Sequence, residues 1–181
     1  MEDVFQKLIL MIRAYYPVLY LHSYEYYRTK QKIKGIVELL RREGKKVNYY
    51  QWDCVYGLVQ ILPDKTEIRI ERMQNPLEVL AYILNSKKSG EKNIFVLDDI
   101  NNHIERDEVK LMFRKIAEAT NNNTHAIILS SIYRLPAELE KYITVLQIPL
   151  PKRNELGEVL DIVAKQSKVE LKTNLRNRLI D

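Results

Sequence analysis

The stretch that decides the fold is Asn93-Ile94-Phe95-Val96-Leu97-Asp98-Asp99, an apolar run closed by two aspartates. Four consecutive apolar residues without polar alternation are typical of a strand that is buried on both faces, as in a parallel sheet. A second run of this kind, Ala126–Ser130, follows an amphipathic segment from about Glu105 to Thr120 that we predict to be a helix. Strand, helix and strand in this order predict a β-α-β crossover, and therefore an α/β fold.

The same alternation extends outward in both directions. Further strands are predicted at Val18–His22, Lys46–Asp53 and Thr144–Ile148, and further helices at 4–12, 25–43, 76–84, 136–142 and 155–165. A hairpin is predicted over Gly57–Arg72, because Pro63-Asp64-Lys65-Thr66 has the residues of a tight turn. We therefore predict a three-layer domain over residues 1–151, with a five-stranded parallel sheet and a β-hairpin insertion. Residues 152–181, after Pro149-Leu150-Pro151, are predicted to begin an incomplete helical lid subdomain.

Length and composition limit the class of protein. The 181 residues are 46% hydrophobic and 29% charged, which indicates one globular domain with at most a small appendage. The single cysteine, Cys54, excludes an internal disulfide framework, and we interpret it as a small buried side chain. The net charge of +5 is a mild bias that permits an acidic partner without identifying one. No apolar run approaches the ~18 residues of a membrane span, so we expect a cytoplasmic protein without a membrane partner.

Several motifs of catalysis are absent. The P-loop requires G-x-x-x-x-G-K-[ST], and the five glycines, at positions 35, 44, 57, 90 and 157, never have that spacing. They also exclude G-x-G-x-x-G and the G-x-S-x-G nucleophile turn. His22, His103 and His125 show no metal-ligand spacing. We therefore expect no resident cofactor, and no catalytic residue is assigned.

Polar residues end two neighbouring strands of the predicted sheet. Asp98 and Asp99 close one strand, and Ser130 and Ser131 close the next. Because the carboxyl ends of parallel strands meet at one edge, where phosphates bind in such folds, these residues are candidates for a magnesium–phosphate site, with Asp98 as the metal ligand. The alternative is that the aspartates cap the following turn. Arg134 is either an anion contact or an ordinary surface arginine.

A basic helix and an aromatic segment raise a different alternative. Basic residues crowd the helix and its exit at Arg28, Lys30, Lys32, Lys34, Arg41, Arg42, Lys45 and Lys46, and tyrosines precede it at positions 15, 16, 20, 24, 26 and 27. Cations bind phosphates and aromatic rings stack on bases, so this region is a candidate for binding single-stranded nucleic acid. Interspersed glutamates instead favour a solvated helix face.

The order of elements resembles the core of an AAA+ ATPase, a P-loop-NTPase-like (AAA+/RecA-type) domain. The resemblance is carried by Arg134–Pro151 (RLPAELEKYITVLQIPLP), which is similar to the run from the helix after sensor 1 into the lid. Together with Leu8–Tyr20 (LILMIRAYYPVLY), it resembles more narrowly the N-terminal half of uncharacterised AAA+ ATPases first described as a hypothetical plastid reading frame. In that family a P-loop-less AAA-like domain precedes a second AAA domain that carries the Walker motifs.

The resemblance implies roles for individual residues. Asp98 and Asp99 take the Walker B position, and Ser130 or Ser131 takes the sensor 1 position. The Walker A position is occupied by 22–28, His-Ser-Tyr-Glu-Tyr-Tyr-Arg, which has no phosphate-binding lysine, and no Arg-x-x-Arg pair follows Arg134. We therefore expect no hydrolysis by this chain. It is predicted to be a regulatory or protein-interaction module of a larger AAA+ ATPase.

The predicted partner is a catalytic AAA domain or a neighbouring subunit. The hairpin Gly57–Arg72 and the turn Tyr20–Tyr27 are the candidate contact surfaces. The enzyme alternative is an ATPase that binds ATP and magnesium through Asp98 and an unconventional phosphate loop at His22–Arg28.

Overall fold

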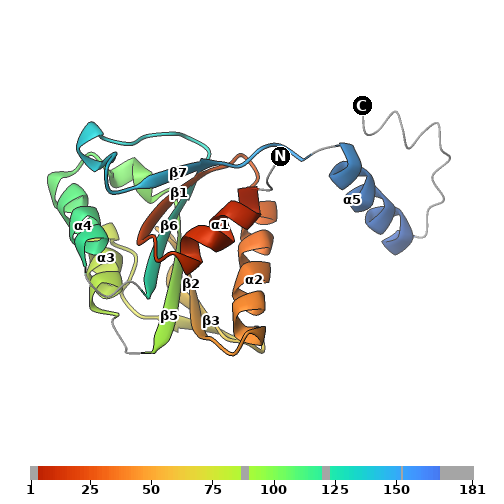
Figure 1. Ribbon diagram of the computed structural model, residues 1–181, viewed down its shortest axis with the longest axis horizontal. Coiled ribbons are helices and arrows are strands. Elements are labelled where there is room, and N and C mark those ends of the chain that lie inside the picture. The colour runs from red at the N-terminus through yellow and green to blue at the C-terminus, as the bar shows by residue number, and fades with distance from the viewer. Residues whose placement is uncertain (1–3, 87–89, 120–122, 152, 168–181) are drawn as a thin grey trace. The chain divides into compact units, whose positions relative to one another are not determined.

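The computed structural model describes residues 4–86, 90–119, 123–151 and 153–167. Its contacts divide the chain into two units, Met1–Ile148 and Pro149–Asp181. The first unit is a three-layer α/β sandwich, with α1 and α2 on one face of a central sheet and α3 and α4 on the other (Figure 1). Its elements are α1 (Val4–Arg13), β1 (Val18–His22), α2 (Tyr26–Arg42), β2 (Lys46–Asp53), β3 (Gly57–Ile61), β4 (Glu67–Ile70), α3 (Pro76–Asn85), β5 (Glu91–Asp98), η1 (Ile100–His103), α4 (Asp107–Glu118), β6 (Thr124–Ser130), η2 (Ala137–Leu139) and β7 (Thr144–Gln147).

The sheet has seven strands in the order β4-β3-β2-β5-β6-β1-β7. Five neighbouring strands of the sheet are parallel, as predicted: β2, β5, β6, β1 and β7. The remaining two, β3 and β4, pair in antiparallel fashion. The prediction of a five-stranded parallel sheet with a separate hairpin insertion was therefore wrong in this respect. The hairpin extends the sheet, because a short turn brings β3 back beside β2 with Asp53 paired to Gly57.

Both faces of the parallel strands are covered, which explains their unbroken apolar runs. In β5, Phe95 and Leu97 pack in the core beneath α3 and α4, whereas Ile94 and Val96 pack beneath α1 and α2. The ring of Phe95 stacks on that of Tyr50 with centroids 4.4 Å apart. Because helices cover both faces of the sheet, the polar residues that follow the strands gather where the strands end.

Turn chemistry fixes the ends of the elements. Asn75 caps α3, since its side chain accepts from the backbone N–H of Leu77 at 3.0 Å. Gly57 begins β3 with a φ of +75°, and a Cβ there would meet the backbone of Met73 at 3.2 Å. Only glycine combines this dihedral with so close a contact. The predicted helix over 136–142 is only the short turn η2, and Cys54, predicted to be buried, is exposed in the turn between β2 and β3.

The second unit contains α5 (Arg153–Gln166). Of the segment 152–181 that we predict to begin a lid, residues 153–167 are described and the remainder lies outside the described residues, so the lid stays a prediction. Within the described part of the chain, no helix is long and apolar enough to cross a membrane.

Candidate functional site

The candidate site lies where β1, β5 and β6 end. These three strands are neighbours, and their register places His22 beside Ser130 and Asp98 beside Leu129. All three therefore present their carboxyl ends at one edge of the sheet, which we call the carboxyl edge. The structure thus brings together the aspartates and serines that sequence analysis selected.

Asp99 is the centre of a hydrogen-bond network at this edge. Its backbone adopts the left-handed conformation, with a φ of 51°, while its N–H donates to the carbonyl of Leu129 at 2.9 Å. The carboxylate oxygen Oδ1 accepts from the Ser130 hydroxyl at 2.7 Å and from the Tyr26 hydroxyl at 2.5 Å. Two donors from two different elements therefore hold one oxygen of this carboxylate.

Asp98 is paired with a cation from α2. Its Oδ2 forms an ion pair with Lys30 Nζ, and the two side chains are 16% and 23% exposed. The other oxygen, Oδ1, is buried without a hydrogen-bond partner among the described residues. Burial raises the pKa of Asp98, and the hydrogen bond and charge of Lys30 oppose that rise. The site therefore contains one satisfied and one unsatisfied carboxylate oxygen on the same residue.

The turn from β1 into α2 is closed by its own hydrogen bonds. Ser23 Oγ bonds the Thr29 hydroxyl at 2.8 Å and accepts from the N–H of Glu25 at 3.1 Å. Arg28 donates to the Glu25 carboxylate at 2.9 Å. A phosphate loop needs backbone N–H groups directed at the ligand, whereas here the polar side chains of the turn bond one another.

Tyr26 connects this turn to the next strand. Besides donating to Asp99, its hydroxyl accepts from the backbone N–H of Ser131 at 3.0 Å. Burial raises its pKa, and the hydrogen bond with Asp99 adds to the rise. Lys30 was not placed at the site by sequence analysis, which grouped it with the basic helix. Tyr26 lies in the 22–28 segment that was given the Walker A position, but its hydrogen bond with Asp99 was not predicted.

An aromatic cluster covers part of the same edge. The ring of His22 packs near those of Tyr24 and Tyr133, with centroid separations of 5.4 Å and 6.2 Å. Tyr24 is 67% exposed and Tyr133 is 52% exposed, whereas Tyr20 beneath them is fully buried. Arg134 is exposed, and its backbone N–H donates to the Tyr20 hydroxyl at 3.3 Å. The exposed rings give this edge an apolar surface.

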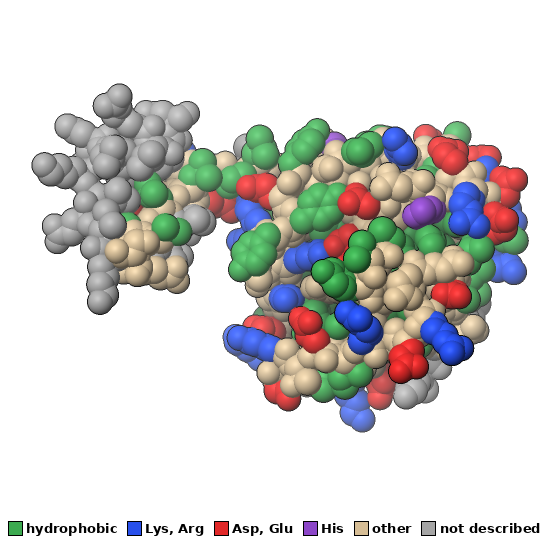
Figure 2. Space-filling view, turned by 180° about the vertical axis from the view of Figure 1, so that it is seen from behind, with side chains coloured by type: hydrophobic (Ala, Val, Ile, Leu, Met, Phe, Trp, Pro, Cys, Tyr) green, Lys and Arg blue, Asp and Glu red, His purple; other side chains and the backbone are tan. Residues whose placement is uncertain are grey.

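Internal contacts engage several cations of the basic helix. Arg41 donates to the carbonyls of Val47 at 3.0 Å and Ile61 at 3.4 Å. Lys32 lies 5.8 Å from the ring centroid of Phe5, and Arg42 is exposed. Figure 2 shows acidic and basic side chains interspersed over one face of the protein, without a broad area of one sign.

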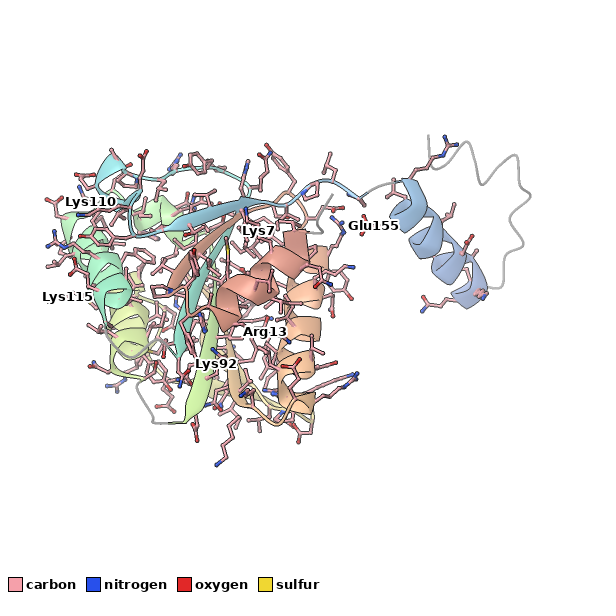
Figure 3. The ribbon with its side chains drawn as sticks, viewed as in Figure 1. Lys7, Arg13, Lys92, Lys110, Lys115 and Glu155 are labelled. Carbon is pink, nitrogen blue, oxygen red and sulfur yellow. The ribbon has the colours of Figure 1, made fainter. Side chains whose placement is uncertain are left out.

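A second polar cluster lies at the opposite, amino-terminal edge of the sheet. Lys92 is 2.9 Å from Nε2 of His125 and donates to the carbonyl of Ile12 at 3.2 Å. Figure 3 shows Lys92 at the start of β5, below the end of α1 that carries Arg13. Burial lowers the pKa of His125 to about 4 and that of Lys92 to about 8. Burial therefore disfavours the charged form of both side chains. Within the described ranges, no group of three or more metal-binding side chains occurs.

Comparison with known proteins gives consistent results. A family model described as the N-terminal domain of SpoVK-like AAA ATPases matches residues 4–148. The chain is 28% identical to the uncharacterized AAA domain-containing protein ycf46 of Guillardia theta over 153 residues, which are 83% of this chain and 28% of that protein. It is 25% identical to ycf46 of Pyropia yezoensis over 175 residues, 96% of this chain and 34% of that protein. The chain thus spans about a third of the length of these relatives.

Solved structures share the fold. A chain of the HORMA:CdnC:Trip13 complex from E. coli superimposes with a TM-score of 0.61 at 12% identity, over 91% of this chain and 55% of that one. A variant of RuvB from Thermotoga maritima superimposes with a TM-score of 0.52 at 16% identity, over 93% of this chain and 52% of that one.

Proposed function

We propose, on the premise that this chain belongs to the family of SpoVK-like AAA ATPase N-terminal domains, that it is a non-hydrolysing AAA-type module. In this proposal it regulates or connects parts of a larger AAA+ ATPase by binding protein. The relatives that it matches are about three times longer and are described as AAA domain-containing proteins. The catalytic domain belongs to the remainder of such a protein or to a neighbouring subunit.

The observation that carries the proposal is the occupation of Asp98 and Asp99 by groups of the protein itself. Lys30 provides the cation for Asp98, and Tyr26 and Ser130 provide the donors for Asp99. A magnesium–phosphate complex at this edge would compete with the ammonium group that already neutralises Asp98. These residues therefore do not fit the metal, although Asp98 Oδ1 is unpartnered.

The turn before α2 supports the same conclusion. Phosphate binding at the start of a helix depends on glycines that let the backbone approach the ligand. Between β1 and α2 the side chains are instead those of Ser23, Tyr24 and Glu25, and Ser23 bonds both Glu25 and Thr29. Opening this turn for a phosphate would break those bonds.

Titration calorimetry with Mg-ATP and with Mg-ADP tests the proposal. The 181-residue protein at about 100 µM is expected to give neither binding heat nor a thermal shift. Lys30→Met, which frees Asp98 from its cation, is the matched variant and is also expected not to bind. Micromolar binding by the wild-type protein that Asp98→Ala weakens tenfold would refute the proposal and establish a nucleotide site.

The protein-binding part of the proposal assigns the exposed rings of the carboxyl edge to the partner. Tyr24, Tyr27 and Tyr133 are 67%, 78% and 52% exposed, and large aromatic side chains are enriched at the centres of interfaces. In a full-length ATPase of this family that contains this domain, Tyr24→Ser with Tyr133→Ser is expected to alter the ATPase rate or the assembled mass. Leu111→Ser on α4, a residue 40% exposed, is the control. Equal behaviour of both variants and wild type contradicts this assignment.

A further inference from the structure

The outermost strand of the sheet, β4, has a free edge. Among the described residues it pairs only with β3, and its residues Glu67, Ile68 and Arg69 are all exposed, with Ile68 at 46%. An uncovered edge strand presents unpaired backbone groups that accept another strand. Native proteins usually block such an edge with charge, so the arrangement of charges on β4 decides whether it repels or attracts a partner.

The direction of the backbone groups on β4 follows from the hairpin. The N–H of Leu62 donates to the carbonyl of Thr66, so these two residues form a hydrogen-bonded pair. Hydrogen-bonded and non-hydrogen-bonded pairs alternate along an antiparallel ladder. Ile68, opposite Gln60, therefore bonds to β3, whereas Glu67 and Arg69 direct their N–H and C=O groups to the free edge.

The charges on this edge are complementary to themselves. If a second copy of β4 is laid antiparallel with Ile68 facing Ile68, Glu67 of each copy faces Arg69 of the other. In this register Glu67 and Arg69 form the hydrogen-bonded pairs and the two Ile68 residues form the closer, non-hydrogen-bonded pair. The backbone pattern and the charge pattern therefore select the same register.

Registers in which the two-fold axis moves by one residue, which slips the pairing of the strands by two residues, are disfavoured. A two-fold axis at Glu67 places Glu67 against Glu67, and an axis at Arg69 places Arg69 against Arg69, and like charges directly opposite are destabilising. Within the described residues, neither Glu67 nor Arg69 has an ion-pair partner, although Arg69 lies 5.7 Å from the ring centroid of Tyr56. The other edge strand, β7 (Thr144–Gln147), has no charged residue that would select a register.

We propose that two copies of this protein associate through their β4 strands, antiparallel about a two-fold axis at Ile68. The association joins the two seven-stranded sheets into one continuous sheet. The pairing is isologous, as in most symmetric dimers. Because a ladder of four residues is shorter than the interfaces of stable dimers, we expect weak association, with a Kd on the order of 10–100 µM. This inference is independent of the proposed function.

Sedimentation velocity of the 181-residue protein from about 5 to 500 µM tests the dimer. The wild-type protein is expected to shift from monomer to dimer over this range. Each single reversal, Arg69→Glu or Glu67→Arg, gives residues 67 and 69 the same charge, so that like charges face each other across the interface. The two-fold axis makes this pair occur twice in the dimer, and each variant is expected to raise the Kd about tenfold or more. The double variant Glu67→Arg with Arg69→Glu restores opposite pairs and is expected to return the Kd to within about threefold of wild type.

Residue-resolved amide exchange provides the second measurement. At high concentration the amides of Glu67 and Arg69 are expected to become protected, whereas those of Ile68 and Ile70 already bond to β3 and should not depend on concentration. Circular dichroism confirms that each variant is folded. A monomer at 500 µM, a dimer unaffected by both single reversals, or a double variant as weak as the single ones overturns the proposal.

Discussion

Replacement of Lys30 by methionine tests the charge balance at the carboxyl edge. Methionine keeps the length of the side chain but removes the cation that neutralises Asp98. Loss of one partner of a fully buried ion pair costs about 3–5 kcal/mol. Because Asp98 and Lys30 are 16% and 23% exposed, we expect a smaller loss, about 2–3 kcal/mol in the free energy of unfolding at pH 7.5. For a domain of this size, that corresponds to a decrease of about 4–12 °C in Tm.

The loss should depend on pH in a defined direction. Burial already raises the pKa of Asp98 in the folded protein, and removal of Lys30 raises it further. A carboxyl group with a raised pKa binds its proton more tightly when folded, so its contribution to stability is lost as the pH rises through that pKa. The deficit of Lys30→Met should therefore be largest at pH 7.5 and shrink as the pH falls toward 4–5.

Urea denaturation at pH 7.5 and at pH 5 measures both effects. Lys30→Met combined with Asp98→Asn removes the unpaired charge and is expected to recover stability to within about 1 kcal/mol of wild type. Lys34→Met, one turn further along α2, is the control and should change stability by no more than about 0.5 kcal/mol. A Lys30→Met deficit below 0.5 kcal/mol, or one equal at both pH values, would refute the reasoning.

Further outcomes are expected elsewhere in the fold. Gly57→Ala should destabilise the protein by about 1–3 kcal/mol in thermal denaturation, because its φ is +75° and the space for a Cβ is occupied, whereas Gly35→Ala, with open space in α2, should stabilise it by about 0.5–1 kcal/mol; the reverse order contradicts the backbone assignment. His125, with a pKa lowered to about 4 by burial, should remain neutral in an NMR titration down to pH 5, and stability should fall as the pH decreases from 6.5 toward 4; normal titration near 6.5 would contradict its burial. Tyr26→Phe removes a donor to Asp99 and should cost about 1–3 kcal/mol in urea denaturation; no loss would mean that water replaces the hydroxyl.

The helices and strands of this protein follow from its sequence more directly than their arrangement in the sheet does. The strand Val18–His22 and the strand Lys46–Asp53 were predicted with the bounds that the structure has, because apolar runs and turn residues are local signals. The position of β3 beside β2 was not predicted. A local signal for it existed, since Asp53 accepts from the N–H groups of Val55 and Tyr56 and so closes a tight turn.

The candidate site was predicted in part for the same reason. Asp98, Asp99 and Ser130 were found because each closes an apolar strand, and parallel strands share an edge. Lys30 was not assigned to the site, and the contact of Tyr26 with Asp99 was not predicted, since Lys30 and Tyr26 lie 68 and 73 residues from the aspartates that they contact. The order of strands in the sheet brings α2 and its side chains close to the end of β5. Spacing along the chain does not reveal that order.

The position of β1 between β6 and β7 has a consequence for synthesis on the ribosome. Its two neighbours, β6 and β7, are the last strands of the sheet to be synthesised. The carbonyl that accepts a hydrogen bond from the hydroxyl of Tyr20 lies 112 residues further along the chain. At roughly 5–20 residues per second, the first strand remains without a partner for several seconds after it leaves the exit tunnel. We therefore expect translation stalled before β6 to leave an apolar strand exposed to chaperones, whereas the hairpin and β2 can pair while the rest of the chain is still being made.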